Sequence, residues 1–126
     1  ICPSNPFVSV APILDLAETW KALRAADCPV VLVSPIVAGM ALKGPAAKMM
    51  LELKMPSTAL AVAQYYAETY PGLVDGFVLD NADALSAEAV RALGLMPMVT
   101  QTVMKNLDDK QALAEAVLRF SNELAG

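Results

Sequence analysis

The 126-residue sequence contains no histidine and only two cysteines, and both shortages exclude chemistry. Without histidine, neither a Ser-His-Asp nor a Cys-His catalytic arrangement can be built from this sequence. Cys2 and Cys28 stand in no CxxC or other ligand-like spacing, so no zinc site is expected. We predict two reduced, partly buried thiols, as in a cytosolic protein, and a cytoplasmic location.

Long apolar runs and an excess of positive charge are also missing. No apolar stretch approaches the roughly 20 residues that cross a bilayer, and the first residues lack the features of a signal peptide. We therefore expect no membrane segment. The formal net charge of −4 argues against nucleic-acid binding, which depends on neutralising phosphates. A small phosphorylated ligand is compatible with this charge, because it needs positive charge only locally.

What the sequence does contain is an alternation of short apolar runs with helical patterns, which is typical of a three-layer α/β domain with a mostly parallel sheet. Pro97, near the start of one predicted strand, favours either an edge position for this strand or a place at the entry to it. The segment Phe7–Val10 fits either a strand or an extended loop. The predicted strands are Pro29–Val33, Gly76–Asp80 and Met96–Thr100, and the predicted helices cover about 16–26, 45–55, 57–70, 86–93 and 108–124.

Three of the predicted helices have marked features. In the helix at 16–26, Leu16, Trp20 and Leu23 recur at i, i+4 and i+7, which predicts that all three face the core. The helix at 57–70 follows Ser57, a residue type that commonly caps helix amino ends. The last helix carries an apolar face of Leu113, Val117, Phe120 and Leu124.

The loops that follow strand ends are the candidate ligand sites, because parallel sheets bind ligands at the carboxyl edge. The longest runs from Ser34 to Lys48, with Pro35 and Ile36 at its start, and it leads into a helix amino end, which favours anions. Its candidate ligand contacts are Ser34, Pro35, Ile36, Gly39, Lys43, Gly44 and Lys48. The same pattern also fits an ordinary βα loop with solvated lysines.

Three further places carry polar groups. Ser4 and Asn5, held between prolines, are suited to hydrogen-bonding a ligand, but the pattern equally fits a capping turn. Asp80 closes a predicted strand and is the best-placed acid for a metal or a general base, whereas Asp83 fits support of the next turn. The loop 100–102 follows the third strand. We expect no metal site wholly inside this sequence, because other acids are not nearby.

Ile1 leads directly into a turn-rich stretch, and we interpret it as the end of a strand whose partners lie outside this sequence. Residues 1–126 are then a partial domain. The hydrophobic fraction of 56% supports this interpretation and predicts an apolar surface where the remainder docks.

Three strings together resemble the C-terminal part of the 2-phospho-L-lactate transferase family of coenzyme F420 biosynthesis. They are Cys-Pro-Ser-Asn-Pro-Phe-Val-Ser from Cys2, Val-Ser-Pro-Ile-Val-(x)-Gly with Leu-Lys-Gly-Pro-Ala-(x)-Lys-Met-Met from Val33, and Val-Asp-Gly-Phe-Val-Leu-Asp from Val74. The similarity extends in order through the strand at 96–100 and the last helix. Local departures are Ala11, Ala38, Met40 and Ala47, where the family often has Gly, Gly, a basic residue and Asp.

The resemblance implies a Rossmann-like fold and a reaction. Such enzymes move a phospholactyl or phosphoenolpyruvyl group from a guanosine diphosphate-linked donor to the deazaflavin Fo and release GMP with the help of Mg²⁺. The family's glycine-rich loop and early acids are not in this sequence, so we expect the missing N-terminal half to bind Mg²⁺ and residues 1–126 alone to be inactive. The catalytic residues are not assigned. Backbone N–H groups and lysines would hold the diphosphate.

Two other readings stay open. One is a non-catalytic, nucleotide-sugar-binding regulatory protein of the same broad superfamily, and the other is a stand-alone α/β interaction module. The strings around Ser4-Asn5 and Lys43-Gly44-Pro45 favour the transferase. A homo-oligomer is compatible with every reading.

Overall fold

Three parallel strands form the central sheet of the computed structural model, which describes residues 1–41 and 44–126. Their order in the sheet is β1 (Val31–Val33), β4 (Gly76–Asp80), β5 (Met96–Thr100). All three predicted strands are confirmed, and β5, which contains Pro97, is an edge strand of this sheet. Because the strands are parallel, their carboxyl ends meet at one edge.

Ile1 lies along the edge of β1 that faces away from β4. Its nitrogen donates to the Val31 carbonyl at 2.6 Å, and its carbonyl accepts from the Val33 nitrogen at 3.0 Å. One residue that bonds in this way to both neighbours of Leu32 has the pattern of a parallel strand. Ile1 therefore continues the hydrogen bonding of the sheet past β1.

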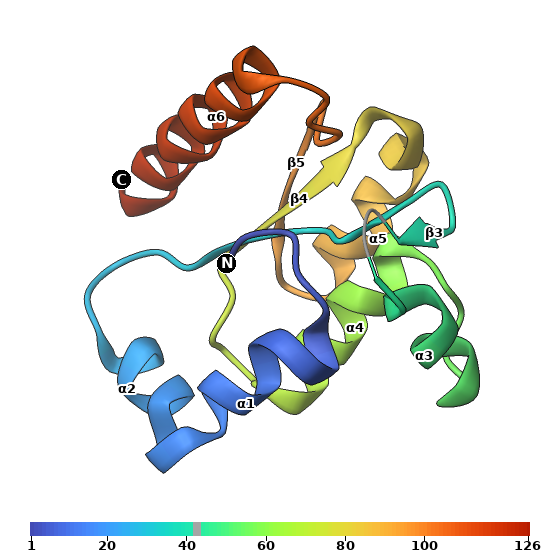
Figure 1. The fold of residues 1–126 in the computed structure, drawn as a ribbon. Helices are drawn as coiled ribbons and strands as arrows, with labels where there is room; N and C mark the ends of the chain where they lie inside the picture. Colours follow the sequence, from blue (N-terminus) through green and yellow to red (C-terminus); the bar gives the residue numbers. More distant parts are fainter. Residues whose placement is uncertain (42–43) are drawn as a thin grey trace.

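Helices cover both faces of the sheet, as Figure 1 shows, and this confirms the three-layer α/β arrangement. The helix α6 (Leu107–Ala125) packs on one face, and α4 (Ala59–Thr69) and α5 (Ala87–Ala92) lie on the other. Alternate strand residues point to opposite faces. Val31, Val33 and Val78 pack with Leu113 and Phe120 of α6, whereas Leu32, Phe77 and Leu79 belong to the larger core on the opposite face. The predicted apolar face of α6 is thereby confirmed.

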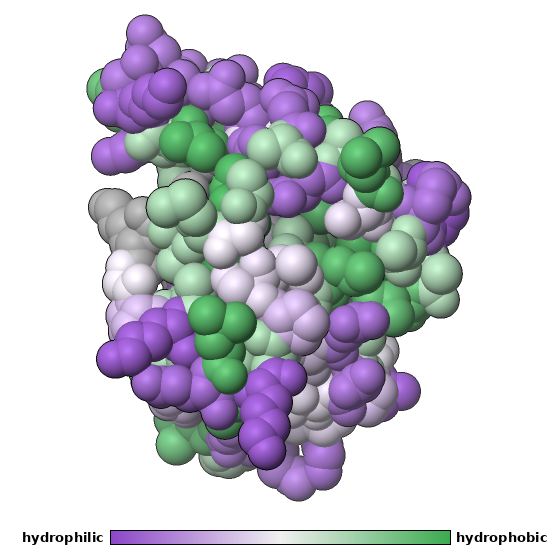
Figure 2. All heavy atoms as spheres, turned by 90° about the vertical axis from the view of Figure 1, so that its right-hand side faces the viewer, coloured by the Kyte–Doolittle hydropathy of each residue, from purple (hydrophilic) through white to green (hydrophobic). Residues whose placement is uncertain are grey.

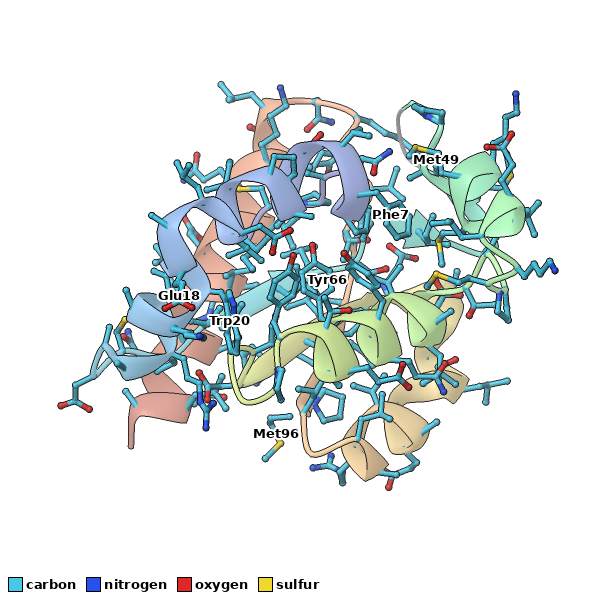
Figure 3. The ribbon with its side chains drawn as sticks, turned by 90° about the horizontal axis from the view of Figure 1, so that it is seen from below. Phe7, Glu18, Trp20, Met49, Tyr66 and Met96 are labelled. Atoms are coloured by element: carbon cyan, nitrogen blue, oxygen red, sulfur yellow. The ribbon has the colours of Figure 1, made fainter. Side chains whose placement is uncertain are left out.

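Aromatic side chains join the N-terminal helices to α4. Phe7 meets Tyr65 edge-on with ring centres 5.1 Å apart, and Trp20 meets Tyr70 at 5.9 Å. Figure 3 shows Phe7, Trp20 and Tyr66 gathered between the N-terminal helices and α4. Tyr66 is buried, and its hydroxyl has no hydrogen-bond partner among the described residues. These contacts fix the segment that carries Ser4 and Asn5 against the domain.

The N-terminal segment differs from its prediction in two respects. Residues 7–10 are not a strand or an extended loop, because Pro6–Val10 forms a π-helical turn that leads into α1 (Ala11–Leu14). The single helix predicted at 16–26 is divided into a 3₁₀ turn, Leu16–Glu18, and α2 (Thr19–Ala25).

The division of that helix explains why its predicted core face is wrong. Ala17 and Glu18 have φ values of 45° and 61°, so the helical periodicity does not continue from Leu16 to Leu23. Trp20 packs against the core, but Leu16 and Leu23 are exposed. A left-handed turn by a non-glycine residue leaves no signal in a pattern of apolar residues.

The loop after β1 contains a small hairpin rather than irregular chain. Its strands are β2 (Ile36–Val37) and β3 (Met40–Ala41), joined by Ala38 and Gly39 with φ values of 49° and 79°. Two consecutive positive φ angles are typical of a type I′ hairpin turn. The Asp83 carboxylate accepts from the Ala38 nitrogen at 3.1 and 3.3 Å, which holds the turn against the segment that follows β4.

Ser57 takes part in the same turn and not in a helix cap. Its hydroxyl donates to the Gly39 carbonyl at 2.8 Å. The cap of α4 is Thr58, whose hydroxyl accepts from the Ala61 nitrogen, so the predicted cap is wrong by one residue. The helix α3 (Ala46–Glu52) lies before this point and has Pro45 at its amino end.

Large apolar side chains reach the surface on the side that carries β3 and α3. Figure 2 shows this side, where apolar spheres gather between hydrophilic margins. The exposed residues on these and neighbouring segments are Met40, Leu51, Leu53 and Leu85.

Cys2 and Cys28 are also exposed and free, so their predicted partial burial is wrong. Among the described residues, no helix is both long enough and apolar enough to cross a membrane.

Candidate functional site at the carboxyl edge of the sheet

The three buried polar residues of the described chain all lie where a strand ends. Ser34 follows β1, Asp80 ends β4, and Thr102 follows β5, and none is more than 7% exposed. Polar side chains are rarely buried without hydrogen bonds. The carboxyl edge is therefore the place where polar groups are concentrated inside this molecule.

Asp80 ties the end of β4 to the loop after β5. One carboxylate oxygen accepts from the Thr102 nitrogen at 2.8 Å and from the Thr102 hydroxyl at 3.1 Å, and the other accepts from the Ala82 nitrogen at 2.9 Å. Burial by itself raises the pKa of Asp80, but these bonds and one from the Val103 nitrogen outweigh it and hold the pKa below the usual value. Asp80 is therefore an ionised anchor for residues 102–103.

Ser34 makes a local turn with its own hydroxyl group. Its hydroxyl donates to the Ile36 carbonyl at 2.8 Å and accepts from the Ile36 nitrogen at 3.2 Å. Both residues are fully buried. Neither one lines the cavity at this edge. Both shape the chain that enters the hairpin, and their predicted ligand contacts stay a prediction.

A cavity of about 490 Å³ lies at the carboxyl edge. Four predicted site residues, namely Ser4, Asn5, Pro35 and Gly44, come together around it. This cavity, which we call the carboxyl-edge cavity, also has a wall from the C-terminal part of the chain: Val103, Met104 and Lys110. The structure thus joins the two turns that the sequence singled out and adds a third segment.

The side chain of Asn5 hydrogen-bonds to the backbone. Its side-chain oxygen accepts from the Phe7 nitrogen at 2.9 Å and from the Val8 nitrogen at 3.2 Å, which caps the turn that begins at Pro6. Its amide nitrogen contacts the Met49 sulfur at 3.4 Å. Of the two interpretations of this turn, the geometry supports capping for Asn5, whereas Ser4 makes no such bond.

The remaining predicted contacts lie elsewhere. Gly39 lies in the hairpin turn and does not line the cavity. Lys48 does not line it either, and its ammonium group faces the Glu52 carboxylate at 3.8 Å. Lys43 lies outside the described residues. Lys110 is the basic residue that the sequence argument missed, although it follows the predicted 100–102 loop at the start of the last helix.

The described residues do not fit a metal centre of their own. They contain no group of three acids or cysteines placed to share an ion. The oxygens of Asp80 already accept N–H and O–H groups, and Asp83 and Asp75 accept from the nitrogens of Ala38 and Val30. Each of these acids has a structural partner.

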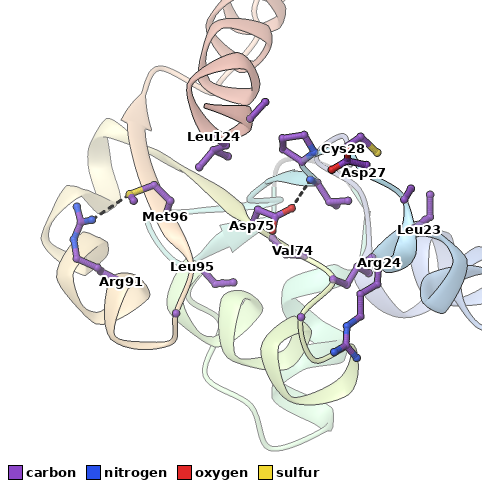
Figure 4. A pocket seen from close by; sticks show the side chains of 17 residues that line it. Leu23, Arg24, Asp27, Cys28, Val74, Asp75, Arg91, Leu95, Met96 and Leu124 are labelled. Carbon is purple, nitrogen blue, oxygen red and sulfur yellow. Dashed lines mark hydrogen bonds between the residues drawn. The ribbon is translucent and has the colours of Figure 1, made fainter.

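A second, larger cleft opens at the opposite edge of the sheet. It has a volume of about 920 Å³ and lies at the amino ends of the strands. Figure 4 shows Arg24 and Arg91 on different sides of it, with Asp75 and Leu95 between them. Arg91 is directed to the Met96 sulfur, at 3.1 Å. The two arginines do not converge on one point, so we call this space the amino-edge cleft and do not assign it a ligand.

Comparison with known proteins gives the family. The family described as 2-phospho-L-lactate transferase CofD matches residues 1–121. This chain belongs to that family. The resemblance inferred from the three strings is therefore confirmed, and the matched range includes both turns and the Lys110 wall of the carboxyl-edge cavity.

Relatives in the CofD family carry two kinds of name. The chain is 40% identical over 98% of its length to "2-phospho-L-lactate transferase" of Methanocaldococcus jannaschii. It is 36% identical over 97% of its length to "Phosphoenolpyruvate transferase" of Streptomyces griseus, and 34% identical to the protein of that name from Mycolicibacterium smegmatis. The chain spans 37% of the length of the first two relatives and 36% of the third.

Proposed function

We propose that this chain is the C-terminal part of an enzyme that transfers a phospholactyl or phosphoenolpyruvyl group from a guanosine diphosphate-linked donor to the deazaflavin Fo. GMP is the leaving product, and the pathway is coenzyme F420 biosynthesis. Membership of the CofD family carries this proposal. The names of the relatives support a transferase and not a nucleotide-sugar-binding regulatory protein.

The carboxyl-edge cavity is the part of the site that this chain supplies in the proposal. It lies where ligands bind in open parallel sheets, and it joins Ser4, Gly44 and Lys110. Transfer of a phosphoryl-linked group depends mainly on positioning and on charge stabilisation, which suits a chain without histidine. The hydroxyl of Ser4 can position a substrate oxygen, and Lys110 can balance negative charge.

The proposal assigns Mg²⁺ to residues outside this sequence, because each acid discussed above has a structural partner. No step of the reaction is therefore assigned to a metal ligand of this chain. Residues 1–126 alone are expected to be inactive. The complete protein is proposed to be cytoplasmic.

The test is product formation by the complete protein. Donor, Fo and Mg²⁺ are mixed, and GMP and the Fo conjugate are separated by chromatography. We expect GMP to appear together with the conjugate, and donors carrying lactate or enolpyruvate, compared at equal concentration, identify the acid. A reaction without Fo controls for hydrolysis of the donor. GMP release that does not require Fo, or no release with either donor, would contradict the proposed function.

A further inference from the structure

Lys110 is the charged residue among the described lining of the carboxyl-edge cavity. The cavity is lined by serine, asparagine, glycine, proline and apolar residues, and Lys110 is the single charged residue among the described lining residues. None of the ion pairs found in the described chain includes it. A lysine with no carboxylate partner that borders a cavity of about 490 Å³ is able to pair with a ligand.

The surrounding structure holds the backbone of the helix start that carries this lysine. The side chain of Asn106 caps α6 by accepting from the Asp109 nitrogen at 2.8 Å. The carboxylate of Asp109, the neighbour of Lys110, accepts from the Lys105 nitrogen at 2.8 Å and from the Gln101 side chain at 3.4 Å. Asp109 is therefore directed to the loop before α6. The start of α6, and with it Lys110, is fixed relative to the anchored Thr102.

The other walls shape the cavity around this charge. Val8, Pro35 and Met104 give the cavity apolar surface, and Ser4 adds a hydroxyl. Val8, Met104 and Lys110 also reach solvent, so a charge contact here acts at the fairly high dielectric constant of a protein surface. Ser4 can donate a hydrogen bond to the same anion.

We propose that Lys110 binds an anionic oxygen group of the substrate in this cavity, either the diphosphate of the donor or the carboxylate and phosphate of its acid. This inference deepens the proposed function and rests on it for the identity of the substrate. The sequence-based candidates for the positive charge of the site are Lys43 and Lys48. Lys43 lies outside the described residues, and Lys110 at the beginning of α6 is a further basic residue at the cavity. Lys48 faces Glu52 and does not line the cavity.

The experiment compares Lys110→Gln with Lys48→Gln in the complete protein. Calorimetric titrations use three separate probes: pyrophosphate, GDP and 2-phospholactate. We expect Lys110→Gln to weaken at least one of them by about tenfold to a hundredfold, the range for loss of a charge-assisted hydrogen bond. Lys48→Gln should change affinity by less than about twofold, because its exposed ion pair contributes little. Lys110→Arg keeps the charge and should retain most of the affinity.

The arms of the experiment separate the outcomes. A loss with GDP and pyrophosphate assigns Lys110 to the diphosphate, and a loss with 2-phospholactate alone assigns it to the acid. Equal affinities of Lys110→Gln and wild type for all three probes, or no binding of any probe by wild type, would overturn the inference. If Lys110→Gln loses pyrophosphate binding but the wild-type protein releases no GMP from the donor, the anion site stands and the proposed function fails. Circular dichroism of each variant checks that the fold is unchanged.

Discussion

At the carboxyl edge of the sheet, polar side chains are buried and hydrogen-bonded, whereas at the amino edge they border an open cleft. Ser34, Asp80 and Thr102 each have fixed partners inside the molecule. The amino-edge cleft is almost twice as large, at about 920 against 490 Å³, but its two arginines point apart. Buried polar anchors beside a lysine that has no carboxylate among the described lining residues, and not volume, therefore indicate where a ligand would be held.

The two edges also differ in what stabilises them. The carboxyl edge depends on side-chain bonds to backbone nitrogens, which Asp80, Asn5 and Asp83 all make. At the amino edge Asp75 makes one such bond, to the Val30 nitrogen, and α6 packs so closely over Gly76 that an added Cβ would collide with Phe120 and Leu124. Substitutions on the two edges should therefore act by different mechanisms, and the following four expectations test that difference.

Asp80→Ala should have the largest effect. It leaves the buried Thr102 nitrogen and hydroxyl without an acceptor, which we expect to lower the free energy of unfolding by about 3 kcal/mol. It should also weaken pyrophosphate binding, because Val103 and Met104 of the cavity wall follow Thr102. Urea unfolding and calorimetry of the complete protein measure the two effects.

The control for Asp80 is Asp75→Ala at the amino edge. The exposed carboxylate of Asp75 accepts one bond, from the Val30 nitrogen at 2.7 Å, so we expect a loss of about 1 kcal/mol and unchanged binding. The pH dependence adds a second check. Because hydrogen bonding holds the pKa of Asp80 below its ordinary value of 3.8, its stabilisation is present above that pH and is lost as the pH falls through the folded-state pKa. The stability difference between wild type and Asp80→Ala should shrink in that range. Equal effects of the two substitutions would remove the distinction between the edges.

Gly76→Ala should destabilise the amino edge through packing. A methyl group at Gly76 would lie 2.6 Å from a ring carbon of Phe120 and 2.7 Å from a methyl carbon of Leu124. Both side chains belong to α6, which must move outward, and we expect a cost of about 1–3 kcal/mol. Thermal unfolding measures the cost, and pyrophosphate affinity should stay unchanged. The double substitution Gly76→Ala with Leu124→Ala should recover part of the loss if the collision is its cause.

Asn5→Ala should have a smaller effect, at the carboxyl edge. It removes the acceptor for the Phe7 and Val8 nitrogens, and loss of a helix cap costs about 1 kcal/mol. Asn5→Asp keeps an acceptor at the same position and serves as the control. Chemical unfolding measures the free energy of unfolding of both variants. A loss of stability of the same size in Asn5→Asp would argue against capping as the role of this side chain.

Ala38→Gly should have the smallest effect and the opposite sign. Ala38 has a φ of 49° in the hairpin turn, a conformation that glycine adopts without steric cost. Offset by the greater freedom of glycine in the unfolded chain, the gain should be about 0.5 kcal/mol. Ala41→Gly in β3 is the control, because glycine within a strand is destabilising. A loss of stability in Ala38→Gly would contradict the assignment of backbone strain to this position, because the backbone N–H that donates to Asp83 is kept in the variant.

Much of the fold could be predicted because the strands are short, continuous apolar runs. The predicted strands Gly76–Asp80 and Met96–Thr100 have the bounds that the structure shows, since residues buried on both faces of a parallel sheet leave an unbroken apolar signal. The single helix predicted at 16–26 is wrong because Ala17 and Glu18 adopt left-handed backbone conformations, which their residue types do not predict. Apolar spacing carries no information about such turns.

The candidate site could be predicted in part, for a different reason. Ser4, Asn5, Pro35 and Gly44 follow strands or precede a helix in the sequence, and parallel topology brings such positions to one edge. What could not be predicted is which polar groups remain available. The side chains of Ser34 and Asn5 already hydrogen-bond to the backbone of neighbouring residues, because buried backbone groups need partners.

The sequence by itself determined the three strands, the α/β class and the family, because these depend on local apolar runs and on short strings of residues. The tertiary structure decided that Lys110, rather than Lys48, borders the cavity beside Ser4 and Gly44. That choice depends on how α6 packs across β4 and β5, through contacts between residues far apart in the chain. Lys48, by contrast, lies one helical turn from Glu52, and this proximity along α3 directs its charge away from the cavity.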